Sequence, residues 1–309
     1  MGTDFNNINY LKEFTVSEHQ AEHNISDWQK YFAVIFSQRN ERLQERFIWL
    51  KVVEKATHLA EAIRKYHYDE ATQHIARLFC WLCSFCTNNE TILGTTSLND
   101  IIWWKYPYVC PHCAPKLKQL LESGNLDSSI LVCICDTKKI EEQKDKGIDE
   151  KTLDWFRNRN EKLKKEKLTK LDGWMRMFQD LYESRIELLS LDSIAFHLLE
   201  EVGEVICVLR NYSEIESTLN LKEYKRTNKM VKEAMRRYED DKRIKPTKKD
   251  KISSDKYLKR CQSFLKNCMK EEVADVFSWL AAVVIKITRQ RRRYISYDKR
   301  YIESCRNAI

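Results

Sequence analysis

Two short acidic motifs on predicted helices carry the residue types best suited to chemistry. Glu200, Glu201 and Glu204 form an E-E-x-x-E motif, and Glu272 and Asp275 form an E-x-x-D motif further along the chain. Residues three apart lie on neighbouring parts of one helical face, so each helix can direct two carboxylates toward a common centre. Converging carboxylates repel one another, and a hard divalent cation relieves that repulsion. The motifs therefore predict an oxygen-rich site for Mg²⁺ or Mn²⁺.

Four cysteines form a second candidate site, of a different kind. Two residues lie between Cys110 and Cys113, one residue lies between Cys133 and Cys135, and 19 residues separate the two pairs. Two close cysteine pairs at this separation are typical of a tetrahedral structural zinc site. Because protein ligands fill all four positions, we expect the Zn²⁺ to be structural rather than catalytic.

The elements that must position these residues are helices. The chain of 309 residues contains only 6 Gly and 4 Pro, too few for the frequent turns of sandwiches and barrels. Its composition therefore predicts an all-α fold. Apolar spacing of three and four residues predicts helical stretches over 31–66, 68–87, 150–190, 191–211 and 256–294. Residues 88–150 lack this pattern and are interpreted as an inserted small module followed by a polar linker.

An internal repeat organises the helices. Residues 52–65 align with 198–211, and residues 73–86 align with 271–284, with matched apolar positions such as Phe79 with Phe277. We therefore divide the chain into a first repeat (1–98), a zinc-binding insertion with its linker (99–150) and a second repeat (151–309). The second repeat contains a long basic connector at about 212–260.

The two acidic motifs in their apolar context resemble the MazG-like, all-α nucleoside triphosphate pyrophosphohydrolases, over roughly residues 170–290. The resemblance implies that Glu201, Glu204, Glu272 and Asp275 are Mg²⁺ ligands and that Glu200 is a supporting or water-orienting carboxylate. The connector is longer than is usual in this family, with 67 residues between Glu204 and Glu272.

MazG-like proteins usually assemble as dimers whose subunits complete one helical bundle. By this resemblance, the present chain is a pseudo-dimer in one polypeptide, with room for a higher oligomer. The first repeat carries Lys55, His58, His74 and Arg77 at the positions of the four implied ligands. These side chains cannot hold Mg²⁺, so the first repeat is interpreted as degenerate.

The activity that the resemblance implies is hydrolysis of a ribo- or deoxyribonucleoside triphosphate to the monophosphate and pyrophosphate by a metal-activated water. Basic residues beyond the Asp275 helix are candidates for holding the substrate phosphates, namely Lys286, Arg289, Arg291, Arg292 and Arg293. A solvated basic helix end is the equally weighted alternative for this run. The chain has no G-x-x-x-x-G-K-[ST] sequence, which excludes a P-loop nucleotide hydrolase.

Charge and targeting signals define the remaining expectations. The net charge is +8, and residues 221–260 alone carry 16 basic and 7 acidic side chains. This basic excess leaves a second class of function open, a non-catalytic protein that senses a nucleotide or binds nucleic acid through the basic stretch and the zinc module. The first residues lack the pattern of a signal peptide, and the longest apolar run, residues 277–285, is too short to span a bilayer. We therefore expect a cytoplasmic protein without a membrane partner.

Overall fold

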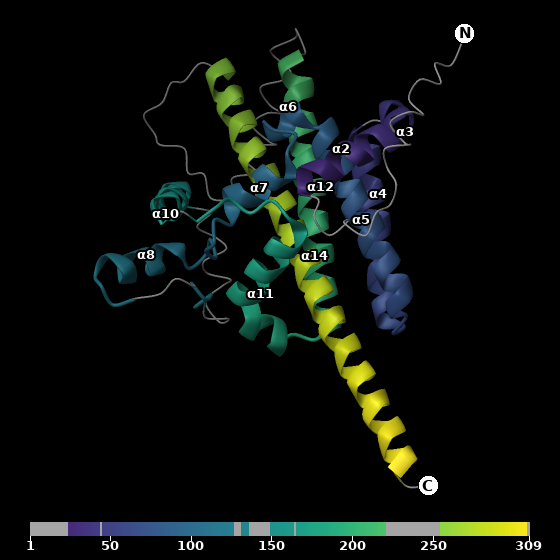
Figure 1. Cartoon of the computed structure of the whole chain (residues 1–309). Helices are drawn as coiled ribbons and strands as arrows, with labels where there is room; N and C mark the ends of the chain where they lie inside the picture. Colours follow the sequence, from purple (N-terminus) through teal and green to yellow (C-terminus); the bar gives the residue numbers. More distant parts are fainter. Residues whose placement is uncertain are drawn as a thin grey trace.

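The structure, a computed structural model, describes residues 24–43, 45–126, 131–135, 149–163, 165–220 and 254–307 (Figure 1). In these ranges every regular element is an α-helix, beside one isolated β-bridge between Asn24 and Lys170, so the all-α prediction is confirmed there. The helices are α2 (Ile25–Ile35), α3 (Ser37–Arg42), α4 (Glu45–Arg64), α5 (Tyr68–Asn88), α6 (Glu90–Leu93), α7 (Leu98–Lys105), α8 (Ala114–Glu122), α10 (Glu150–Lys162), α11 (Leu171–Leu188), α12 (Leu191–Asn220) and α14 (Ser254–Asn307).

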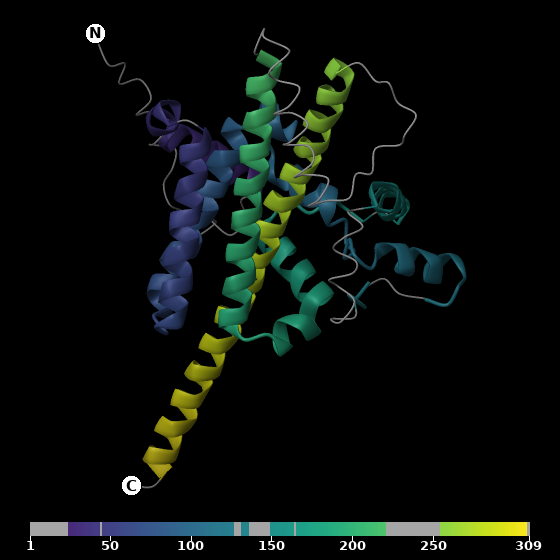
Figure 2. The same cartoon turned by 180° about the vertical axis from the view of Figure 1, so that it is seen from behind.

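Two helical pairs form the body of the molecule. The first pair is α4 with α5 and the second is α12 with α14, and α4 also packs against α12 (Figures 1 and 2). The indole Nε1 of the buried Trp49 in α4 donates to the carbonyl of Val202 in α12, at 3.1 Å. Between the pairs, the rings of Phe79 in α5 and Phe277 in α14 lie 6.4 Å apart. Residues at matched positions of the two aligned segments therefore meet across the centre of the bundle.

The helix α14 is longer than its predicted stretch, and its C-terminal end extends beyond the other helices in both views (Figures 1 and 2). The part of the connector from 221 to 253 lies outside the described residues, so nothing is assigned to it.

Two of the predicted helical stretches, 31–66 and 150–190, are each interrupted in the structure. The first is divided near Phe36 and Leu43, and the second by the non-helical residues 165–169.

Helix α7 is held in place by α2, which lies across it. Gln29 of α2 is buried, and its amide nitrogen donates to the carbonyl of Thr96 at 2.8 Å, while its amide oxygen accepts from the backbone N–H of Leu98 at 2.8 Å. Because both ends of one buried amide are satisfied at the start of α7, the direction of that helix is fixed. The same helix ends at Lys105, which places its last residue against α14.

A tight turn leads from α7 to the first cysteine pair. Tyr108 has a φ of 57°, in the left-handed region that few residues other than glycine adopt. The turn is held by contacts on both sides: Asn160 donates to the buried carbonyl of Pro107 at 2.8 Å, and the Tyr108 hydroxyl donates to the carbonyl of Glu166 at 3.1 Å. The segment from Lys105 to Cys110 is therefore fixed at both ends and in its middle.

Candidate functional site

The carboxylates of the two acidic motifs converge between α12 and α14. Glu201, Glu272 and Asp275 each offer an oxygen, and these oxygens all lie within 4.8 Å of one another. Glu201 is 7% exposed and Glu272 is 2% exposed, so two of the three carboxylates are almost fully removed from water. Oxygens bound to one octahedral Mg²⁺ ion lie about 2.9 Å apart when adjacent and about 4.2 Å apart when opposite, so small side-chain adjustments would let these oxygens share one ion. The cluster could hold a metal ion.

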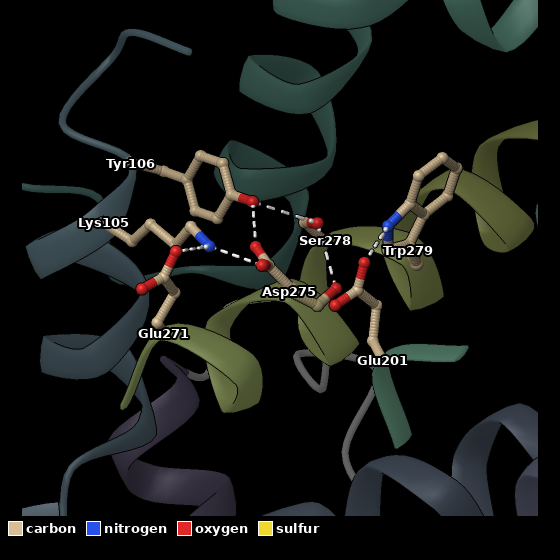
Figure 3. Close-up of polar contacts among 7 residues, drawn as sticks. All are labelled: Lys105, Tyr106, Glu201, Glu271, Asp275, Ser278 and Trp279. Atoms are coloured by element: carbon tan, nitrogen blue, oxygen red, sulfur yellow. Dashed lines mark hydrogen bonds and ion pairs between the residues drawn. The ribbon is translucent and has the colours of Figure 1, made fainter. Parts of the chain in front are cut away.

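The helical period explains why these side chains point inward together. Four valines of the motifs are at most 1% exposed, and their burial directs the adjacent carboxylate-bearing faces of the two helices toward the interior. They are Val202, Val205, Val273 and Val276. On the other side of Glu201, the indole N–H of Trp279 donates to a carboxylate oxygen at 3.3 Å (Figure 3). The ring of Trp279 is stacked on His197, with centroids 4.5 Å apart.

Two further residues of the site come from α7 and the residue after it, and sequence reasoning did not assign them to it. Lys105 is fully buried, and its Nζ forms an ion pair with Asp275 Oδ2 and lies 3.5 Å from Glu271 Oε1 (Figure 3). The hydroxyl of Tyr106 donates to Asp275 Oδ1 at 2.5 Å and lies 3.3 Å from the hydroxyl oxygen of Ser278. Both oxygens of Asp275 are therefore held by groups of the insertion.

The protonation states follow from burial and from the charges nearby. Burial, followed by the negative charge of Asp275, raises the pKa of Glu201 to about 9, although Lys105 acts in the opposite direction. Burial lowers the pKa of Lys105, but Asp275 and Glu271 outweigh it and hold that pKa well above its usual value, so the ammonium keeps its charge. Glu272 and Glu204 also raise the pKa of Glu201. The centre therefore carries more negative charge than one ammonium balances.

The remaining two acidic residues of the motifs are placed differently. Glu204 is close enough to Glu201 to raise its pKa, but it is not one of the three residues whose oxygens converge. Glu200 is exposed, and its carboxylate lies 3.2 Å from Nδ1 of His197 on the surface of α12. The structure thus brings together three of the five acidic residues of the motifs.

The four predicted zinc ligands also meet. The sulfur atoms of Cys110, Cys113, Cys133 and Cys135 all lie within 4.8 Å of one another, and those of Cys110 and Cys135 are 3.7 Å apart. Four thiolates 2.3 Å from a tetrahedral Zn²⁺ would lie about 3.8 Å from each other, so the spacing fits such an ion. Hydrogen bonds among the four thiols lower the pKa of Cys133 and raise those of Cys113 and Cys135, so without a metal ion the cluster favours a thiolate at Cys133. The cluster could hold a metal ion.

The cysteine cluster is joined to the bundle through α11. That helix is kinked at Tyr182, and the backbone N–H of Cys133 donates to the carbonyl of Leu181 at 2.9 Å. The ring of Tyr182 is stacked on Phe178, and Phe178 packs edge-on against Tyr106 with centroids 5.1 Å apart. Tyr182 and Phe178 therefore form a row of aromatic rings between the second cysteine pair and Tyr106, which bonds to Asp275.

The predicted phosphate-binding residues are engaged elsewhere. Lys286 donates to the carbonyls of Ile186 and Glu187 at the end of α11, at 2.7 and 3.1 Å. Arg289 forms ion pairs with Glu183 and Glu187, and Arg291 forms one with Asp69. At a helical rise of 1.5 Å per residue, Lys286 lies about 16 Å along α14 from Asp275. The side chains of Arg292 and Arg293 lie outside the described residues.

The basic residues of the first repeat form their own local contacts. Lys55 is bonded to Glu54 at 2.5 Å, and Arg77 is exposed. The rings of His58 in α4 and His74 in α5 are in edge-to-face contact, 5.3 Å apart. These histidines stand at the positions aligned with Glu204 and Glu272, so the two residues at these positions of the first helical pair are in contact.

The aromatic residues before the cysteines pack inward. Trp103 lies against Tyr108 and Trp174, and the indole N–H of Trp104 donates to Glu150 at 3.1 Å. Lys270 lies over the Trp104 ring, 5.0 Å from its centroid. Together with the buried Lys105, these contacts bind the start of the insertion to the bundle.

Comparisons with known proteins add no assignment: the chain matches none of the family models, curated proteins or solved structures with which it was compared. Across the described ranges, no helix combines the length and apolar character that crossing a membrane requires. The function must therefore be argued from the site.

Proposed function

We propose that this protein is a Mg²⁺-dependent nucleoside triphosphate pyrophosphohydrolase with a MazG-like bundle, whose second helical pair holds the active centre. The convergence of Glu201, Glu272 and Asp275 carries the proposal. These residues come from two motifs far apart in the sequence, and together they gather more carboxylate charge than the ammonium of Lys105 balances, which favours the binding of a further cation.

Two contacts support the pseudo-dimeric arrangement. In a two-fold assembly, equivalent residues near the axis contact each other. Phe79 and Phe277 form such a pair, and His58 contacts His74 within the first helical pair, as Glu201 approaches Glu272 within the second. In this proposal the first helical pair supports the fold and has no metal of its own.

The proposed chemistry divides between the ion and the chain. When bound, Mg²⁺ polarises the phosphate oxygens and makes a bound water more acidic. Glu201, Glu272 and Asp275 hold the ion, and Glu201 must lose its proton to do so. Tyr106 and Lys105 hold both oxygens of Asp275, which keeps that ligand from rotating away. The carboxylate of Glu204, one turn along the helix, is the group we assign to orienting water.

The cysteine cluster completes the proposal as a structural Zn²⁺ site. Its sulfur spacing fits a tetrahedral ion with four protein ligands, and such a site leaves no position for substrate. By fixing the segment that ends α7, the bound ion would hold Lys105 and Tyr106 against Asp275.

Pyrophosphate release from a panel of ribo- and deoxyribonucleoside triphosphates tests the function. We expect release with Mg²⁺, none with EDTA, and at least a hundredfold loss in Glu201→Gln with unchanged helicity. Glu200→Gln, one residue away on the exposed face, is the matched control and should retain most of the activity. Release of orthophosphate would contradict the bond assignment. If no nucleotide of the panel is hydrolysed and the protein binds nucleic acid with strong salt dependence, the non-catalytic alternative is supported.

A further inference from the structure

Lys105 is a permanent component of the carboxylate centre. Its side chain is fully buried, and it contacts Asp275 and Glu271 from the end of α7. Lysine is almost never buried to this extent unless its charge is compensated. The helix that carries it is fixed at its start by Gln29 and beyond its end by the turn at Tyr108, so the ammonium has little freedom to leave.

The ammonium of Lys105 lies on one side of Asp275 together with Glu271, and Glu201 lies on the other side (Figure 3). In two-metal centres, two cations about 3.5–4 Å apart lie on either side of shared ligands. Here a protein ammonium lies between the carboxylates of Asp275 and Glu271.

We propose that this centre binds a single divalent cation, at Glu201, Glu272 and Asp275, and that Lys105 takes the place of a second metal ion. The proposal rests on the metal site of the proposed function, but not on the reaction assigned to it. Because Lys105 acts through Asp275, it is a positioning residue. Its fixed charge balances part of the buried carboxylate charge without a second ion, and it repels any cation that approaches from the Glu271 side.

Counting bound Mn²⁺ tests this inference without substrate. The full chain, with its cysteines first saturated with Zn²⁺, is titrated with Mn²⁺ while free Mn²⁺ is followed by electron paramagnetic resonance. We expect one Mn²⁺ per wild-type chain, and none in Glu272→Gln. In Lys105→Gln the amide can still donate to Asp275, but the charge is gone. This variant should bind the first ion at least tenfold more tightly and take up a second, with the spectral signature of a coupled Mn²⁺ pair.

Two control variants separate charge from packing. Lys105→Arg keeps the positive charge and should bind one ion, as should Tyr106→Phe, which loses only a hydroxyl donor to Asp275. Two Mn²⁺ ions at the carboxylates of the wild type would overturn the inference, as would a single ion of unchanged affinity in Lys105→Gln. If Lys105→Gln does not fold, Lys105→Met is titrated in its place, because it keeps an unbranched buried side chain without the charge, and the same second ion is expected.

The inference and the proposed function fail separately. One Mn²⁺ that is lost in Glu272→Gln, without pyrophosphate release from any nucleotide, would refute the pyrophosphohydrolase and leave the one-ion centre intact. Pyrophosphate release by a wild-type centre that holds two ions would do the reverse. A chain that binds no Mn²⁺ at its carboxylates would refute both.

Discussion

Binding of a divalent cation should be strongly pH dependent, because Glu201 is protonated in the metal-free centre. Its pKa is raised to about 9, mainly by burial and then by the charge of Asp275. At pH 7 a carboxyl group with this pKa is ionised in about 1% of molecules. A cation must therefore displace a proton, and its apparent Kd should fall about tenfold per pH unit between pH 6 and 8, levelling off above pH 9.

Isothermal titration calorimetry with Mn²⁺ measures both quantities. Affinities at pH 6, 7 and 8 give the slope, and titrations at pH 7 in two buffers of different ionisation enthalpy give the number of protons released, about one per ion. Glu200→Gln should keep the full slope, because Glu200 lies outside the cluster, whereas Glu201→Gln should bind weakly with little pH dependence. A wild-type affinity that changes less than about threefold per pH unit would refute the reasoning.

The same pKa has a consequence for stability without metal. The folded-state pKa of Glu201 lies above the ordinary value of 4.5, so the folded state binds more protons than the unfolded state between about pH 4.5 and 9. This group therefore favours the folded state below that window, and the free energy of unfolding falls by up to about 1.4 kcal/mol per unit as the pH rises through it. Urea unfolding at pH 6 and pH 8 should show the loss in the wild type and a smaller one in Glu201→Gln.

Three further predictions concern the surrounding structure. Removing the proposed Zn²⁺ with a chelator, or changing Cys110→Ser, should lower the melting temperature by several degrees, because the turn after α7 loses its anchor; an unchanged melting temperature would contradict the structural role. Lys286→Met should cost about 1–3 kcal/mol in urea unfolding, since a charged donor to two carbonyls is lost; a cost below about 0.5 kcal/mol would show that these contacts contribute little. Phe277→Ala should lower the free energy of unfolding by about 3–5 kcal/mol, because the buried ring contacts Phe79. Phe196→Ala, at a side chain that is 70% exposed, should change it by less than about 0.5 kcal/mol, and equal effects of the two variants would contradict the packing.

The parts of the fold that depend on local pattern were predictable from the sequence. Spacing of three residues put Glu272 and Asp275 on one face of a helix, and close cysteine pairs indicated one cluster. The breaks near Phe36 and after Lys162 were not predicted, although the second had a sequence signal, since Leu163 is the only apolar residue between 157 and 167. The second break follows from packing, since the carbonyl of Thr169 accepts from Ile25 of a distant segment at 2.8 Å.

The role of Lys105 could not be predicted from its neighbours. In the sequence it stands among Trp103, Trp104 and Tyr106, aromatic residues that more often pack a module onto its helices than bind nucleic acid, but this pattern does not say whether the lysine between them is buried. Its burial depends on how α7 crosses α14, a contact between segments 170 residues apart. Similarly, the position of Lys286 on an amphipathic helix gave no indication that it would bond to the end of α11. Pairing over long separations is decided by packing, which a local pattern does not encode.

The short segment from Lys105 to Cys110 makes the insertion inseparable from the half of the molecule that it serves. A shortened chain without residues 99–150 would still contain the two helical pairs. However, Asp275 would be without the ammonium of Lys105 and the phenol hydroxyl of Tyr106. Within the insertion, substitutions near Lys105 should therefore be tolerated much less well than substitutions at the exposed turn of Ser123 and Gly124. The outer part of the insertion, around this turn, should accept changes in length and composition, whereas changes at Lys105 or Tyr106 should disturb the contacts of Asp275.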